Sequence, residues 1–168
     1  MKRIISFLLT VCMAFGMTLG ASAAEPVYTL TDTPPREEIM IPYGSHPPAS
    51  NADVHNLTIS AYNYQAVEVT RAVYTSKWLT GAASMKITVR NFRSVNGYGG
   101  LPDRVEIEVY QKGNTLNPVK TATVMLGGGG TAGDVTILGL SSNTEYCVKF
   151  IVRFNDDAYA FNGSISLP

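Results

Sequence analysis

The chain has 168 residues, of which 45% are apolar and 15% are charged, and this balance excludes a wholly disordered protein. Thirteen Lys and Arg residues balance thirteen Asp and Glu residues, so bulk charge gives no means of holding a nucleic acid. A chain of this length forms one domain and needs neither a disulfide nor a metal ion to fold.

Residues 1–23 have the three parts of a secretory signal peptide. Lys2 and Arg3 supply the positive start, an apolar stretch follows over 4–19, and the small residues 21–23 fit the cleavage rule. The apolar stretch is shorter than the ~20 residues that a membrane-spanning helix needs. We therefore expect a mature chain that begins at Ala24 or Glu25, has no membrane span, and is secreted or associated with the cell surface.

Residues 24–53 are predicted to form a Pro-rich extended arm or linker. Six of the nine prolines fall in this segment, and the segment shows no sustained periodicity. Two apolar stretches, 27–30 and 39–41, are long enough for a short edge strand. The alternative is that the arm donates a strand or tether to a partner.

From residue 54 onward the apolar residues alternate with polar ones in short runs, which is typical of β-strands with one buried face. Turn residues such as Asn96-Gly97 and Gly127 to Gly130 separate the runs. This spacing predicts an antiparallel β-sandwich over 54–168. A helix over 65–77 is the one competing prediction, and the β-branched residues there favour a strand. The expected strands lie at 57–61, 67–73, 85–89, 105–109, 119–126, 134–140, 145–154 and 161–167.

The segment from Leu140 to Phe150, with the sequence LSSNTEYCVKF, resembles the corner between strands E and F of fibronectin type III domains. The resemblance implies that Tyr146 is a tyrosine corner, its ring in the core and its hydroxyl bonded to the backbone a few residues upstream. It further implies that 85–89, 105–109, 119–125, 135–138 and 161–167 are strands B, C, C′, E and G. The expected fold is thus an all-β, antiparallel immunoglobulin or fibronectin type III-like sandwich preceded by the Pro-rich arm.

The residue types needed for catalysis are scarce, and we expect no enzyme, no cofactor and no metal site. His46 and His55 are the only imidazoles, and no G-x-S-x-G elbow is present. Asp53 and His55 share a strand face, but two ligands are too few for a specific metal site, and ordinary surface residues are favoured. The run Gly127 to Gly130 lacks a phosphate-binding ending and is predicted to be a hairpin.

Two further groups have a structural and a chemical interpretation. The residues Asn155-Asp156-Asp157 suit a turn, and the alternative is that their side-chain oxygens bind calcium. Cys147 is the only cysteine after the signal peptide is removed, so no internal disulfide forms. Alternation places its thiol on the outer face beside Lys149, half-exposed, where the ammonium group favours the thiolate. A thiol function would need a base or second thiol, which the sequence does not offer.

The aromatic residues suggest a binding surface. If the strand that begins at Leu57 continues, Tyr62 and Tyr64 lie on its outer face, and Tyr110 lies on the outer face of 105–109. With Trp78 nearby in the sequence, these rings would form a platform for sugar rings or a protein partner. The alternative is that they pack beneath the Pro-rich arm or in a second layer.

These patterns together predict a secreted, non-enzymatic β-sandwich module for recognition or adhesion at the bacterial cell surface. Its expected ligand is an extracellular protein or carbohydrate. Binding through strands or loops needs no titrating group, which agrees with the scarcity of catalytic residue types. The alternative is a structural or assembly protein that pairs through its N-terminal arm or its edge strands.

Overall fold

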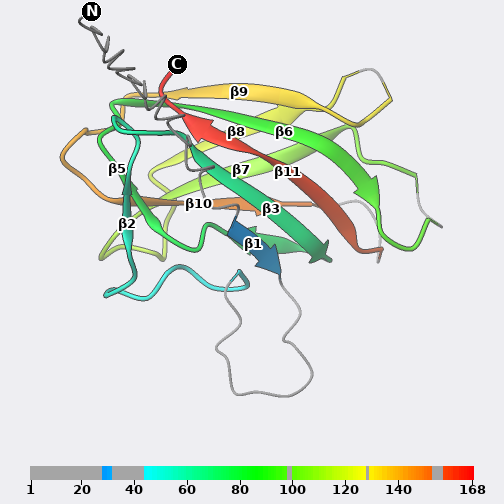
Figure 1. Ribbon diagram of the computed structural model, residues 1–168, viewed down its shortest axis with the longest axis horizontal. Helices are drawn as coiled ribbons and strands as arrows, with labels where there is room; N and C mark the ends of the chain where they lie inside the picture. Colours follow the sequence, from blue (N-terminus) through cyan, green and yellow to red (C-terminus); the bar gives the residue numbers. More distant parts are fainter. Residues whose placement is uncertain (1–27, 32–43, 98–99, 128, 153–156) are drawn as a thin grey trace, which may run out of the picture.

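The computed structural model describes residues 28–31, 44–97, 100–127, 129–152 and 157–168. They form two sheets, a five-stranded sheet of order β1-β3-β11-β6-β9 and a six-stranded sheet that includes β2-β5-β10-β7-β8, with β4 also paired to β10. In Figure 1 the two sheets pack face to face, with β10, β7 and β8 behind the five-stranded sheet. The predicted all-β sandwich is confirmed. The strands are β1 (Tyr28–Thr31), β2 (Val54–Asn56), β3 (Tyr62–Val69), β4 (Ala72–Tyr74), β5 (Trp78–Thr80), β6 (Ser84–Ser94), β7 (Arg104–Gln111), β8 (Lys120–Met125), β9 (Gly133–Leu138), β10 (Tyr146–Ile151) and β11 (Tyr159–Ser166).

The core lies between the sheets and is built by the predicted alternation. Met85, Ile87 and Val89 of β6 are buried, as are the three alternate apolar residues of β7. Each such side chain contributes roughly 1.5–3 kcal/mol by leaving water. Strands and not a helix form over 65–77, as predicted: β3 and β4 occupy most of that segment. No helix among the described residues is long and apolar enough to cross a membrane.

Aromatic rings fill the core beneath the middle of β11. The Phe161 ring stacks on Phe92 at 5.4 Å between centroids, and the Tyr64 ring lies 4.7 Å from that of Phe150. The Tyr64 hydroxyl donates a hydrogen bond of 2.7 Å to the Thr88 carbonyl oxygen of β6. This path passes over Gly163, where an added Cβ would lie 2.7 Å from the Tyr64 hydroxyl oxygen and overlap the Thr88 carbonyl. The sheet can therefore take this form only with glycine at 163.

The expected strand over 57–61 is wrong. The chain turns at Leu57–Ile59, where the Asn56 side-chain oxygen accepts hydrogen bonds from the Thr58 amide (3.0 Å) and hydroxyl (2.8 Å). Asparagine favours such local bonds over continued sheet pairing. β3 begins afresh at Tyr62, so the alternation counted from Leu57 does not carry over into it.

The strand assignment implied by the fibronectin type III resemblance holds in part. β6 pairs with β9, and β8, β7 and β10 are consecutive neighbours, which is the order expected of strands B–E and C′–C–F. The assignment of 161–167 as strand G is wrong, because strand G would lie beside F, whereas β11 lies between β3 and β6 in the other sheet. The edge of β10 that would receive it is paired with β4 and β5.

The described parts of the Pro-rich arm contact the sandwich in two places. β1 pairs in parallel with β3, which agrees with a short edge strand near 27–30. Residues 44–53 lie against the six-stranded sheet, where the Tyr74 amide donates to the Gly44 carbonyl (2.6 Å) and the Trp78 indole Nε1 donates to the Ala49 carbonyl (2.8 Å). The signal peptide over 1–23 and the second apolar stretch over 39–41 lie outside the described residues.

Candidate functional site

Tyr62 and Tyr64 point into the core, so their predicted outward orientation is wrong. Both side chains are at most 1% exposed. The turn after Asn56 restarts the alternation, and β3 directs these two rings inward while Asn63 and Gln65 point outward. The Tyr62 hydroxyl is hydrogen-bonded to the Ser76 hydroxyl at 3.0 Å.

Trp78 and Tyr110 belong to a separate group on the outer side of the six-stranded sheet, which we call the outer aromatic cluster (Tyr74, Trp78, Tyr110 and Cys147). Trp78 is 2% exposed and Tyr110 is 5% exposed, because Ala52 and the segment around it cover the cluster. The four predicted residues are thus split between two places: Trp78 and Tyr110 lie beneath residues of the Pro-rich arm, and Tyr62 and Tyr64 lie in the core. Ligand binding by them stays a prediction, and their burial leaves no exposed ring platform.

The polar groups around the outer aromatic cluster are paired with one another. The Lys149 ammonium lies 2.9 Å from the Glu108 carboxylate and 5.7 Å from the centre of the Tyr110 ring, and the Tyr110 hydroxyl donates to the same carboxylate at 2.6 Å. Burial and the Glu108 hydrogen bond raise the pKa of Tyr110 to about 12. Burial lowers the pKa of Lys149. Its hydrogen bond to Glu108 and the charges of Tyr74, Glu108 and Tyr110 raise this pKa by more, so the net change is an increase. Tyr110 therefore stays neutral and Lys149 stays protonated near neutral pH, which suits a structural role.

The expectation of a half-exposed, activated Cys147 is wrong. Its side chain does lie on the outer face, but it is 0% exposed beneath the aromatic rings. Burial raises the pKa of this thiol to about 12, so the nucleophilic thiolate is suppressed at neutral pH.

The histidine and acidic residues singled out by the sequence have structural partners. His55 Nε2 is hydrogen-bonded to the Ser60 carbonyl at 2.9 Å, and Asp53 forms an ion pair of 3.4 Å with Lys77. The Asp157 carboxylate accepts hydrogen bonds from the Ser94 hydroxyl and the Asn96 amide, while its neighbours 155 and 156 lie outside the described residues. In the described part of the chain no three His, Cys, Asp or Glu residues gather as metal ligands.

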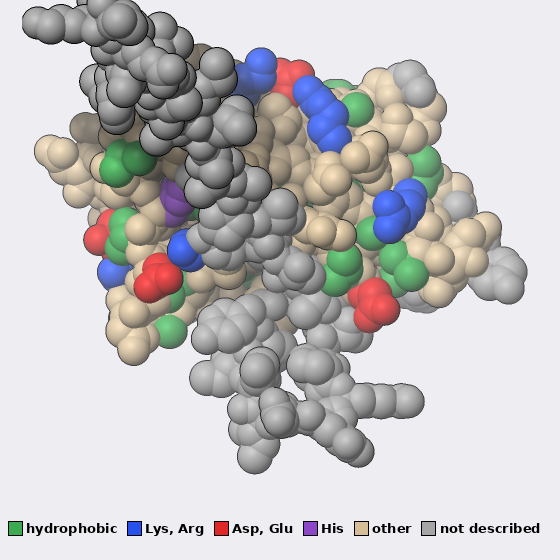
Figure 2. All heavy atoms as spheres, viewed as in Figure 1, with side chains coloured by type: hydrophobic (Ala, Val, Ile, Leu, Met, Phe, Trp, Pro, Cys, Tyr) green, Lys and Arg blue, Asp and Glu red, His purple; other side chains and the backbone are tan. Residues whose placement is uncertain are grey.

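The outer side of the five-stranded sheet carries a continuous polar surface, which we call the polar face. Strand register puts Asn162 of β11 between Gln65 of β3 and Arg90 of β6. In the next row, Ser164 of β11 lies between Asn63 of β3 and Thr88 of β6. This sheet faces the viewer in Figure 2, where blue Lys and Arg side chains lie among tan side chains and backbone in the part formed by β6, β9 and β11, with some green hydrophobic and red acidic side chains. Amide, hydroxyl and guanidinium groups therefore stand in two rows across three neighbouring strands.

Two β-bulges flank β11 next to these rows. The pairing of β11 with β6 shifts between Ala160 and Asn162, and its pairing with β3 shifts between Tyr159 and Phe161. Asn91 in β6 (φ 53°) and Glu68 in β3 (φ 54°) are the only non-glycine residues with positive φ in the described part of the chain. Such backbone is unfavourable for L-residues, and bulges often re-aim side chains at functional sites.

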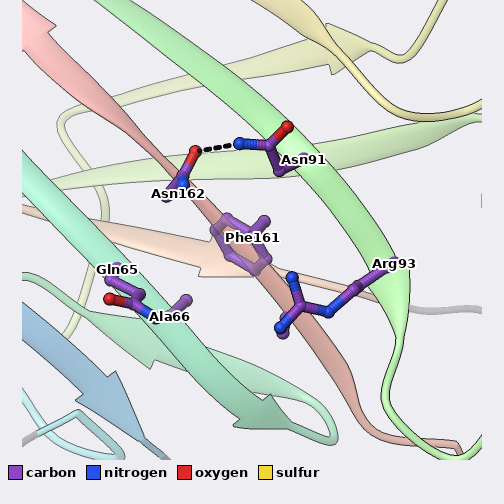
Figure 3. A pocket seen from close by; sticks show the side chains of 7 residues that line it. Gln65, Ala66, Asn91, Arg93, Phe161 and Asn162 are labelled. Atoms are coloured by element: carbon purple, nitrogen blue, oxygen red, sulfur yellow. Dashed lines mark hydrogen bonds between the residues drawn. The ribbon is translucent and has the colours of Figure 1, made fainter.

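The polar face contains two adjoining hollows that share Asn162. The larger is an open hollow of about 490 Å³ whose polar lining is Asn63, Thr88, Arg90, Asn162 and Ser164. The smaller has a volume of about 20 Å³, and its polar lining is Gln65, Asn91, Arg93 and Asn162 (Figure 3). The larger hollow is a shallow depression open to solvent, and the smaller holds one group the size of a water molecule. Together they offer room for a small polar ligand.

The side chains around the hollows are held in defined positions. The Asn91 amide nitrogen donates to the Asn162 side-chain oxygen at 3.3 Å, and in Figure 3 the two side chains point toward each other. Arg90 Nη1 donates to the Val89 carbonyl (2.9 Å) and the Gly133 carbonyl (2.8 Å), which fixes the guanidinium group. In the same view the Arg93 guanidinium extends from β6 toward β11. Such pre-positioned donors reduce the entropy that a ligand must overcome.

Sequence reasoning missed this surface because it searched for aromatic and titratable groups. The alternation of β6 does mark Thr88 and Arg90 as outward, and that of β11 marks Asn162 and Ser164. Their convergence depends on β11 inserting between β3 and β6, a long-range pairing that local patterns do not specify.

Comparison with known proteins gives a structural neighbour but no family. No family model and no curated protein matches the chain. Among solved structures, the pre-peptidase C-terminal domain of a collagenase from Bacillus anthracis is similar with a TM-score of 0.30 and 13% sequence identity, over 68% of this chain and 94% of that one.

Proposed function

We propose that this protein is a secreted, non-enzymatic β-sandwich module for recognition or adhesion at the bacterial cell surface, and that it binds carbohydrate through the polar face. The observation that carries the proposal is the pair of adjoining hollows lined by amide, hydroxyl and guanidinium groups. Sugars present many hydroxyls, each both donor and acceptor, and Asn, Gln, Ser and Thr match both roles.

The chemistry of the lining favours binding over catalysis. Both hollows, as lined by the described residues, contain no carboxylate, imidazole or thiol that would act as a base or nucleophile. We keep the immunoglobulin-like relationship as part of the proposal for the segment from β6 to β10. It is supported by the strand order and by the Ser141–Tyr146 hydrogen bond of 2.9 Å.

A glycan array followed by calorimetry tests carbohydrate binding. We expect Gln65→Ala combined with Asn162→Ala to weaken the best array ligand by about 10-fold or more, since each neutral hydrogen bond contributes about 0.5–1.5 kcal/mol. Thr123→Ala is the matched control, because Thr123 is an exposed polar strand residue of the six-stranded sheet. The proposal fails if the array gives no ligand, or if the double variant binds as tightly as the wild type.

Export is the part of the proposal that rests on residues 1–23. Intact-mass measurement of protein from the culture medium or cell surface should give a chain that begins at Ala24 or Glu25. A species that keeps Met1 and stays inside the cell would contradict export.

A structural or assembly role is the second candidate function, and the pairing of β1 with β3 favours it. Four residues of the arm form a parallel edge strand, which is a common way of joining subunits when the strand comes from another chain. Under this role the mature protein would form dimers or larger species as its concentration rises, and deletion of 24–31 would abolish them. Light scattering that shows a monomer at all concentrations would rule it out.

A further inference from the structure

The polar face has an excess of positive charge where the two hollows meet. Arg90 lines the larger hollow and Arg93 the smaller one, while no Asp or Glu lines either of them among the described residues. Arg93 is exposed and forms no ion pair within the described part of the chain. The lining is therefore complementary to a ligand that carries negative charge.

The smaller hollow suits one compact anionic group. Its volume of about 20 Å³ admits one group the size of a water molecule, and a single carboxylate oxygen is of that size. The planar guanidinium of Arg93 extends over it from β6, and a guanidinium donates two parallel hydrogen bonds to a carboxylate. The amide groups of Asn91 and Asn162 lie beside it as further hydrogen-bonding groups (Figure 3).

The strained backbone at Asn91 produces this arrangement. In a regular strand Arg90 and Asn91 would point to opposite faces. The bulge leaves both side chains exposed, then returns Phe92 to the core and Arg93 to the surface. The positive φ of Asn91 thus brings its amide group to the same hollow as Arg93.

The rest of the polar face bears on the remainder of the ligand through its hydrogen-bonding groups. Peptides are commonly bound at an open sheet edge or in pockets for apolar side chains. Here the two polar rows lie on the face of central strands and end in amide and hydroxyl groups, which suit a polyhydroxylated chain.

We propose that the carbohydrate bound at the polar face is acidic, with a uronic acid carboxylate held by Arg93 and Asn91 in the smaller hollow and neutral hydroxyls held along the larger one. This inference rests on the proposed carbohydrate-binding function and narrows its ligand class. Arg90, fixed by its two backbone carbonyls, supplies a second positive charge along the same path.

Matched polysaccharides test the inference. Calorimetry would compare polygalacturonate, alginate and hyaluronate, each with its carboxyl-reduced form, alongside the array of neutral glycans. We expect at least one acidic polymer to bind about 10-fold or more tightly than its reduced form, with affinity that falls as salt rises, because a hydrogen bond to a charged group is stronger than a neutral one.

Variants of Arg93 and Asn91 test whether these two residues bind the carboxylate of the ligand. Arg93→Gln should remove most of the preference for the acidic form, because the affinity for the acidic polymer should fall much more than the affinity for its reduced form. Asn91→Gly, which keeps the positive φ, should weaken the acidic form in the same direction. Arg104→Gln is the control, because Arg104 is exposed on β7 of the other sheet. A circular dichroism melt of each variant excludes unfolding as the cause.

The outcomes separate this inference from the proposed function. Equal binding of acidic and reduced polymers, or a preference that Arg93→Gln does not change, overturns the acidic ligand. Binding of neutral glycans that Asn162→Ala still weakens would then leave the proposed function standing. Absence of binding to every acidic and neutral polymer overturns both.

Discussion

Tyr146 shows how one hydroxyl joins a loop to the core. Its ring is buried, and its oxygen accepts a hydrogen bond of 2.9 Å from the Ser141 amide five residues upstream. This is the geometry that the fibronectin type III resemblance implies for a corner residue. Tyr146→Phe leaves the Ser141 amide without this acceptor, so we expect a loss of about 0.5–1.5 kcal/mol in the free energy of unfolding. Urea denaturation measures it, and an unchanged midpoint would show that the bond does not matter.

Cys147 makes the free energy of unfolding fall as the pH rises in the alkaline range. Burial raises the thiol pKa from its ordinary value of 9.0 to about 12, so the unfolded chain loses this proton at a lower pH than the folded one. The contribution is therefore complete below pH 9 and is lost as the pH rises toward 12. By pH 10.5 the loss from this group is roughly 2 kcal/mol.

Urea titrations at pH 8 and pH 10.5 test this effect. Cys147→Ala should show a smaller fall in unfolding free energy between the two pH values than the wild type does. The native thiol should also resist a thiol reagent at pH 8 and react once urea unfolds the chain. Fast reaction in the native state would contradict its burial.

Gly163 controls the centre of the five-stranded sheet at the scale of a strand. An added Cβ would lie against the Tyr64 hydroxyl and overlap the Thr88 carbonyl, and both neighbours are held by their mutual hydrogen bond. We expect Gly163→Ala to lower the unfolding free energy by about 1–3 kcal/mol or more. Gly127→Ala is the matched control, since a Cβ there meets open space. Equal stability of the two variants would contradict the packing described for β11.

The bulge at Asn91 is a second strand-level feature with a measurable strain. With φ at 53°, an alanine at this position adopts unfavourable backbone, whereas a glycine does not. We expect Asn91→Ala to be less stable than Asn91→Gly by about 1 kcal/mol in thermal or urea unfolding. If alanine proves the more stable of the two, β6 does not carry the bulge in solution.

At the scale of the whole molecule, the sequence predicts the sandwich well and the polar face poorly. Alternation located β6 and β7 correctly because one face of each strand is buried, which imposes a period of two. It failed at Tyr62 and Tyr64 because the turn at Leu57–Ile59 resets the period, and a one-residue error reverses every side chain.

The topology explains why the polar face was not predicted. It is assembled from β3, β6 and β11, whose polar residues lie up to about a hundred positions apart in the sequence. Burial of the outer aromatic cluster likewise depends on residues 44–53 folding back onto the six-stranded sheet. Local patterns specify which residues face outward, but not which other segments cover them or stand beside them.

We propose that ligands bind at the polar face and not at the outer aromatic cluster, and backbone NMR shift mapping distinguishes the two surfaces. Titration of the isotope-labelled mature protein with an oligosaccharide of the polysaccharide that binds best should perturb amides of β3, β6 and β11 around Gln65, Asn91 and Asn162. Amides around Trp78, Tyr110 and Cys147 should stay unchanged. Perturbations centred on β4, β7 and β10 instead, with none on β11, would show that the ligand binds at the outer aromatic cluster and not at the polar face.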